Sequence, residues 1–162
     1  MNKLIITAFL LVITAPVYAS AGQIGAKAPS FELSDLNGRA ISLEQFKGKV
    51  VFLDFWAPWC IPCKQELPEL DNLYKKYRKD GLEVIGISMD VSEKDIAVFM
   101  QKHPLSMHII VDKKSEVSDA YRVSSLPTGF IISRDGVIKR QHRGFDKELL
   151  PMYEKEIAEL LK

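Results

Sequence analysis

The chain has 162 residues, of which 47% are hydrophobic, and its 22 basic and 21 acidic side chains give a formal net charge of +1. A charge so close to zero argues against a nucleic-acid partner, because phosphate binding requires a basic face. It also gives no reason to expect binding to an anionic membrane surface. The length and the apolar fraction suit one domain with a substantial core.

The amino terminus has the pattern of a secretory signal. Lys3 gives a positive start, Leu4–Ala15 is apolar, and Val17–Ala19 provides the small residues that a signal peptidase reads. The apolar run of about 12 residues is shorter than the roughly 20 that a membrane-spanning helix needs. We therefore expect residues 1–19 to be a cleavable signal peptide, residues 20–162 to form a single domain, and the protein to be exported to the periplasm. An uncleaved signal would instead anchor it to the membrane.

The first predicted strands form a hairpin. Apolar and polar residues alternate in Phe31–Leu33 and in Ile41–Leu43, and Asn37-Gly38 between them suits the positive backbone angles of a tight turn. The run Val50–Phe55 is apolar except for Asp54 and is rich in β-branched and aromatic residues. This pattern is typical of a strand that is covered on both faces, so we expect it in the middle of the main sheet.

A helix follows this strand. Between Ile61 and Arg78, residues recur at helical spacing and share one face, namely Cys63, Leu67, Leu70, Tyr74 and Tyr77. Asp80-Gly81 ends the helix, and Leu82–Met89 reads as a second buried strand. Ser92 is placed to cap another helix, which stops at Pro104.

Strands and helices continue to alternate in the second half of the chain. We predict a strand at 108–111, a helix at 116–121, a strand hairpin at 129–133 and 137–141, and an amphipathic helix at 146–161. Alternation requires crossover helices and parallel pairing, whereas the late hairpin adds antiparallel strands. The predicted class is therefore α/β, with a mixed sheet flanked by helices and an added N-terminal β-hairpin.

The only two cysteines, Cys60 and Cys63, lie at the start of the first predicted helix. A disulfide that closes so short a loop stabilises a chain by only about 2 kcal/mol, so a purely structural bridge would be poorly placed. The free amides and the macrodipole of a helix start favour the thiolate form of the first cysteine, and Pro62 is well tolerated there because it lacks an amide hydrogen. We expect Cys60 to attack a partner disulfide and Cys63 to resolve the mixed intermediate.

The segment Phe55–Cys63, with the sequence FWAPWCIPC, resembles the active site of the thioredoxin superfamily. Further similarity in Gly25–Pro29, Pro68 and Leu126–Thr128 is to the TlpA/ResA-like branch of exported thiol-disulfide oxidoreductases, which are often tied to cytochrome c maturation. The resemblance implies a thioredoxin-like fold and a monomer without cofactor. It also implies disulfide-containing exported partner proteins, apocytochrome c among them. Because a reductant in an oxidising compartment must be recharged, we also expect a membrane thiol protein as electron donor.

The resemblance also implies which residues contact the partner. Pro127 matches the cis-proline that packs beside the two sulfurs, and its neighbours Leu126 and Thr128 match the loop that holds the partner backbone. Trp59 and Pro62 belong to the rim of the same site.

Two acidic residues are candidates for proton exchange with Cys63. Asp54 interrupts an apolar strand, where a charge is costly unless it is paired or protonated; the alternative is a strand-end carboxylate that reaches water. Glu66 lies on the same helix side as Cys63, and by resemblance an acid recurs at this place in exported reductases. Its alternative is an ordinary surface glutamate at the helix start.

Two other functions share parts of this pattern. A copper carrier would use the two cysteines with a histidine, but His103, His108 and His142 are scattered and are expected at the surface. Moreover, a strand would point Met107 and His108 to opposite faces, so we expect no metal site. A thiol peroxidase has a threonine shortly before a single reactive cysteine, where this chain has Pro58-Trp59.

Overall fold

The computed structural model describes residues 22–90 and 92–162. Its main sheet has five strands in the order β5-β4-β3-β6-β7. The central strand β3 pairs in parallel with β4 and antiparallel with β6; β4 and β5 are parallel, and β6 and β7 are antiparallel. The strands span Val50–Trp56 (β3), Leu82–Ser88 (β4), His108–Val111 (β5), Thr128–Ile132 (β6) and Ile138–Arg143 (β7).

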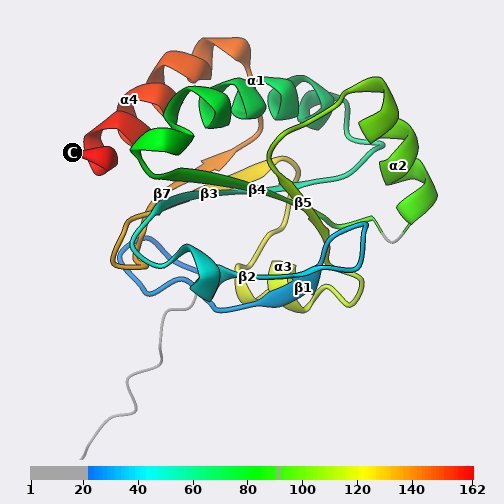
Figure 1. Ribbon diagram of the computed structural model, residues 1–162, viewed down its shortest axis with the longest axis horizontal. Helices are drawn as coiled ribbons and strands as arrows, with labels where there is room; N and C mark the ends of the chain where they lie inside the picture. The colour runs from blue at the N-terminus through cyan, green and yellow to red at the C-terminus, as the bar shows by residue number, and fades with distance from the viewer. Residues whose placement is uncertain (1–21, 91) are drawn as a thin grey trace, which may run out of the picture.

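Helices and a small hairpin cover the two faces of this sheet (Figure 1). Helices α1 and α4 lie over one face, with α2 at its edge, whereas α3 and the hairpin β1-β2 lie over the other. Short 3-10 turns join several elements. The bounds are Glu32–Ser34 (β1), Ala40–Ser42 (β2), Leu43–Phe46 (η1), Ile61–Tyr77 (α1), Arg78–Asp80 (η2), Glu93–Lys102 (α2), Glu116–Ala120 (α3), Lys147–Leu149 (η3) and Leu150–Leu161 (α4).

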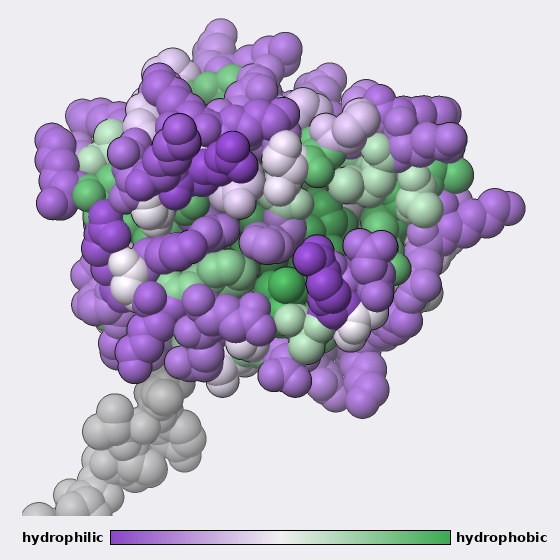
Figure 2. Space-filling model, in the orientation of Figure 1, coloured by the Kyte–Doolittle hydropathy of each residue, from purple (hydrophilic) through white to green (hydrophobic). Residues whose placement is uncertain are grey.

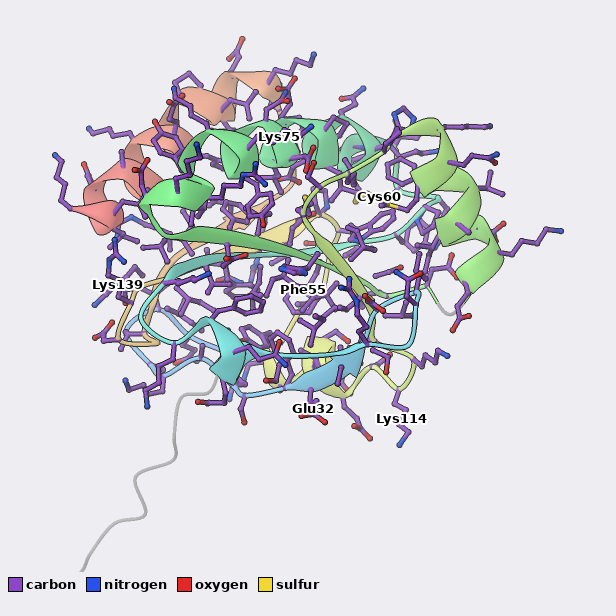
Figure 3. All side chains as sticks on the ribbon, in the orientation of Figure 1. Glu32, Phe55, Cys60, Lys75, Lys114 and Lys139 are labelled. Carbon is purple, nitrogen blue, oxygen red and sulfur yellow. A yellow bond between two sulfur atoms is a disulfide. The ribbon has the colours of Figure 1, made fainter. Side chains whose placement is uncertain are left out.

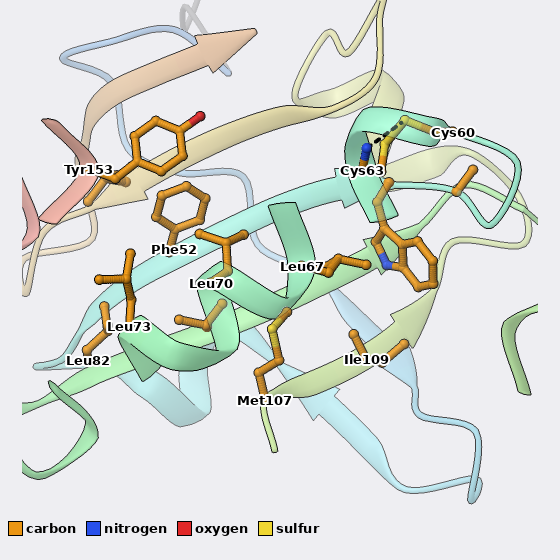
Figure 4. Packing of buried hydrophobic residues seen from close by; sticks show 14 of the residues in the cluster. Phe52, Cys60, Cys63, Leu67, Leu70, Leu73, Leu82, Met107, Ile109 and Tyr153 are labelled. Atoms are coloured by element: carbon orange, nitrogen blue, oxygen red, sulfur yellow. Dashed lines mark hydrogen bonds between the residues drawn. A yellow bond between two sulfur atoms is a disulfide. The ribbon is translucent and has the colours of Figure 1, made fainter. Parts of the chain in front are cut away.

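Strand β3 separates two hydrophobic cores. All of its residues are buried, because both faces of the sheet are covered. Phe52 (Figure 4) and, by its contacts, Trp56 point into the core beneath α1 and α4, whereas Leu53 and Phe55 point into the core on the side of α3 and the hairpin. This alternation places Asp54 on the α1 face, because side chains two residues apart in a strand point the same way.

The sequence signals for helix ends operate as expected. Gly81 follows the last turn after α1 with a left-handed φ of +105°, a conformation that glycine adopts without steric cost. At the start of α2 the Ser92 hydroxyl accepts a hydrogen bond from the amide of Asp95 at 3.3 Å. These signals fix where α1 ends and where α2 begins.

The predicted α/β class with a mixed sheet and an N-terminal hairpin is confirmed. The C-terminal helix differs from the prediction, because the regular α-helix begins at Leu150 and not at Asp146. The Asp146 carboxylate accepts a hydrogen bond from the amide of Glu148 at 3.1 Å and starts a 3-10 turn. Pro151 then occupies the first turn of α4, where its missing amide hydrogen has no partner to lose.

The predicted signal peptide, residues 1–19, lies outside the described residues. Within 22–90 and 92–162, no helix combines the length and the apolar composition needed to cross a membrane. On the face shown in Figure 2, hydrophilic side chains predominate, and apolar side chains are visible in a band across the middle.

Candidate active site

The two cysteines form a disulfide at the N-terminal end of α1, with their Cα atoms 5.3 Å apart (Figures 3 and 4). Cys60 is the N-cap residue, and its Sγ accepts a hydrogen bond from the Cys63 amide at 3.2 Å. Pro62 lies in the first turn of the helix. The sulfur of Cys60 therefore lies where the unpaired amides of a helix start favour negative charge.

The two sulfurs differ in access. Cys63 is completely buried, whereas Cys60 keeps 5% of its surface exposed. The residues on either side of Cys60 are far more open, with 68% exposure for Trp59 and 69% for Ile61. Two exposed apolar side chains thus flank the only sulfur that a partner can reach directly.

The peptide bond between Leu126 and Pro127 is cis, as the sequence comparison implied. Thr128 follows at the start of β6 and is paired in register with Phe55 near the end of β3, so this loop lies at the same end of the sheet as the cysteines. The Thr128 hydroxyl donates a hydrogen bond to the Ser125 carbonyl at 2.7 Å, and the Pro127 carbonyl accepts one from the Gly144 amide at 2.9 Å. Leu126 packs partly against the core that contains both cysteines.

Asp54 lies on the central strand β3 between two glycines of the neighbouring strands. It is completely buried, and neither of its carboxylate oxygens has a hydrogen-bond partner. Its register partners on the two neighbouring strands are both glycines, Gly86 and Gly129. A Cβ atom at Gly86 would lie 3.1 Å from the Trp56 Nε1 atom, and one at Gly129 would lie 2.8 Å from a carbon of the Phe52 ring. Neighbouring side chains, the Trp56 and Phe52 rings among them, therefore occupy the space that side chains at these glycines would need.

Glu66 joins Asp54 in this buried site. It is 1% exposed, and its Oε2 atom has no hydrogen-bond partner. Burial raises the Glu66 pKa to about 8, although the nearby Tyr153 hydroxyl acts in the opposite direction. Burial, together with repulsion from Glu66, raises the Asp54 pKa well above its usual value. Both residues are thus in the interior, not at the surface, and both favour the protonated form.

The raised Glu66 pKa predicts that the oxidised protein loses stability as the pH rises. Between the ordinary glutamate value of 4.5 and about 8, the folded state holds a proton that the unfolded state lacks. The free energy of unfolding should therefore fall across this window, by up to about 1.4 kcal/mol per pH unit. Urea unfolding at a series of pH values checks this. The Glu66→Gln variant should show a flatter dependence, and an unchanged slope would contradict the assignment.

The histidines do not gather around the cysteines. His103 is exposed, and His108 lies 3.5 Å from Glu83. The expected surface position of His142 is wrong: its side chain is only 11% exposed and lies 2.7 Å from the Glu156 carboxylate. Among residues 22–90 and 92–162, no cluster of three or more His, Cys, Asp or Glu side chains is arranged to hold a metal ion.

Sequence reasoning missed three residues that shape this site. Gly86 and Gly129 are distant from Asp54 in the sequence and adjoin it only through strand pairing. Tyr153 reaches the site from α4, close to the other end of the chain. No local motif marks these three positions, because each depends on tertiary packing.

Comparison with known proteins agrees with this geometry. Residues 24–141 match the AhpC/TSA family. The chain is 43% identical over 139 residues to the thiol-disulfide oxidoreductase ResA of Bacillus anthracis, over 84% of this chain and 79% of the relative. It is 40% identical over 114 residues to ResA of Bacillus subtilis (strain 168), over 70% of this chain and 64% of the relative.

A solved structure shares the fold over most of the chain. It is the crystal structure of a putative thiol:disulfide interchange protein DsbE from Chlorobium tepidum, with a TM-score of 0.83 and 34% sequence identity. The match covers 86% of this chain and 99% of that one. The disulfide at a helix start, the fold and the relatives agree, and the chain therefore belongs to the AhpC/TSA family and, together with its ResA relatives, to the thiol-disulfide oxidoreductases.

Proposed function

We propose that the protein reduces disulfides in exported partner proteins, with Cys60 as the nucleophile. The observation that carries this proposal is the difference in access, because Cys60 at the helix start keeps 5% of its surface exposed whereas Cys63 is completely buried. The Cys60 thiolate attacks one sulfur of the partner disulfide, and the other partner sulfur leaves as a thiolate that takes up a proton. Cys63 then loses its proton and attacks the Cys60 sulfur, which releases the second partner thiolate and regenerates the Cys60–Cys63 disulfide.

The buried acids serve the second of these steps. Cys63 is completely buried, so its proton needs an acceptor inside the protein. Asp54 and Glu66 are buried groups with raised pKa values, so either carboxylate, when it is ionised, binds a proton more strongly than an ordinary carboxylate does. We assign them the role of taking up the Cys63 proton.

The partner is held by the surface around Cys60. Trp59 offers an exposed apolar ring, and Pro62 is half-buried in the first helical turn. The loop formed by Leu126, Pro127 and Thr128 lies at the same end of the sheet and supplies backbone for pairing with an extended partner segment. The two-cysteine site and the names of the relatives favour this function over copper delivery and peroxide reduction.

Location and electron supply follow from the same proposal. Residues 1–19 are the proposed signal, residues 20–162 the mature thioredoxin-like domain, and the periplasm the proposed location. An uncleaved signal would keep the chain at the membrane. A reductant in an oxidising compartment must be recharged, so a membrane thiol protein is the proposed donor. The leading candidate for a partner is apocytochrome c, and the protein itself acts as a monomer.

A trapping experiment tests this function. Cys63→Ser removes the resolving thiol, so Cys60 should stay covalently bound to its partner. The variant, expressed as the full chain in its native host, should yield mixed disulfides that mass spectrometry identifies as exported proteins with cysteine pairs. The Cys60→Ser/Cys63→Ser double variant is the control and should capture none. Equal recovery from both variants would contradict the proposal.

A further inference from the structure

Tyr153 is a buried polar group that the mechanism above does not use. It is completely buried in the core beneath α1 and α4, with its ring 5.5 Å from that of Phe52 (Figure 4). By strict geometry its hydroxyl has no hydrogen-bond partner, although it lies close enough to Glu66 to lower the pKa of that carboxyl. A buried hydroxyl without a partner costs free energy, so its retention calls for an explanation.

Three acids lie close enough to Tyr153 to affect its pKa. Two are Glu66, which has an unpartnered Oε2 atom, and Asp54, which has two unpartnered oxygens. The third is Glu156, one turn further along α4. Burial, followed by the negative charge of Glu66, raises the Tyr153 pKa, so the hydroxyl stays protonated.

Next to Tyr153, the side chains of His142 and Glu156 are partly exposed to solvent. The His142 ring lies 4.6 Å from the Tyr153 ring, measured between centroids. Its Nε2 atom is 2.7 Å from Glu156, and the side chains of the pair are 11% and 14% exposed. Arg140 binds the other oxygen of Glu156 at 3.0 Å, which fixes the carboxylate beside His142.

Strand register places Asp54 and His142, the first and last groups of this series, on one face of the sheet. Asp54 on β3 is paired with Gly129 on β6, and Gly129 is paired with His142 on β7. Paired residues project to the same face, so Asp54 and His142 both point toward α1 and α4. The residue between them has no side chain, and α4 places Tyr153 over this face of the sheet.

We propose that Tyr153 and the His142–Glu156 pair form the route by which the proton taken from Cys63 leaves the buried acids for solvent. This proposal rests on the proposed role of Asp54 and Glu66. Cys63 gives its proton to whichever carboxylate of the acid pair is ionised as it attacks Cys60. The protonated acid then passes a proton to the Tyr153 hydroxyl oxygen while that hydroxyl passes its own proton outward to the His142–Glu156 pair. No charge is left on the tyrosine, and water finally accepts the proton.

The test separates the two chemical steps. Reduced protein is mixed with excess glutathione disulfide in dilute buffer at neutral pH, and tryptophan fluorescence follows mixed-disulfide formation and then its resolution by Cys63. Tyr153→Phe and His142→Gln should each slow resolution by about tenfold and leave the first step unchanged. Imidazole, a diffusible proton acceptor, should restore the rate of His142→Gln.

Tyr121→Phe is the matched control. Tyr121 is also completely buried, but it lies in the opposite core, where its hydroxyl donates a hydrogen bond to the Pro29 carbonyl at 2.8 Å. This variant should resolve the mixed disulfide at the wild-type rate.

Three outcomes would overturn the route. One is that Tyr153→Phe and His142→Gln match Tyr121→Phe. Another is that both steps slow together, and the third is that imidazole fails to rescue His142→Gln. The Glu66→Gln variant separates failure of this route from failure of the proposed function. If only Glu66→Gln slows resolution, the acid pair keeps its role but the proton leaves by another route. If Glu66→Gln resolves as fast as the wild type, the proposed role of the acids fails.

Discussion

Cys60→Ser is expected to lower the rate of protein-disulfide reduction by about a thousandfold or more, to the background of the chemical reductant alone. Serine at this position cannot attack a disulfide, and the remaining thiol, Cys63, is completely buried. The assay follows reduction of a test protein disulfide with a small dithiol as electron source.

Cys63→Ser, the same substitution at the other cysteine, is the matched control. Cys63→Ser retains the accessible thiol, so it should react once with the test disulfide and stop at a mixed disulfide on Cys60. Retention of full activity by Cys60→Ser, or adduct formation at Cys63, would contradict the assigned roles.

Asp54→Asn is expected to raise the free energy of unfolding of the oxidised protein at neutral pH by about 2 kcal/mol. Asp54 is buried without a hydrogen-bond partner, and its raised pKa means that folding must keep it protonated or bury its charge. Because the raised pKa makes the wild-type protein less stable as pH increases, the gain in the variant should grow with pH. Urea unfolding at acidic and neutral pH measures the difference.

Asp112→Asn provides the control for this gain. Asp112 is also buried and its Oδ1 atom also lacks a partner, but its Oδ2 atom accepts a hydrogen bond from the Ser118 amide at 2.8 Å. Replacing the carboxyl group by an amide weakens that bond, so this variant should gain less stability than Asp54→Asn. A similar gain in both variants would show that the Asp54 site is not special. Disulfide exchange should also slow in Asp54→Asn, because the site loses a proton acceptor.

A stabilising substitution at Asp54 would have a clear functional meaning. An unpartnered carboxyl in the core weakens the fold, and such groups are found where chemistry needs a shifted pKa. The glycines on both neighbouring strands leave room for the Phe52 and Trp56 rings on the same face of the sheet. The fold thus keeps a destabilising carboxyl group completely buried on the face of the sheet that α1, the helix of Cys63, covers.

The main elements could be predicted because each has a local signal. The apolar run Val50–Phe55 identifies the central strand, Ser92 caps a helix, and Gly81 provides the left-handed turn that ends another. The reactive pair was also predictable, since both cysteines lie in one short motif at a helix start.

The buried part of the site could not be predicted in this way. Sequence alone left Asp54 either in the core or at a strand end open to water, and Glu66 either buried or at the surface. The core that surrounds them includes α4, which packs over the sheet from the far end of the chain and brings in Tyr153. His142 was misjudged for the same reason, because its pairing with Glu156 joins β7 to α4.

The most direct test of the account follows the reduced wild-type protein after mixing with one equivalent of a protein disulfide. Samples quenched with acid at intervals and analysed by mass spectrometry should show a transient adduct at Cys60, then the Cys60–Cys63 disulfide together with fully reduced partner. A protein that remains reduced while the partner keeps its disulfide would contradict the account.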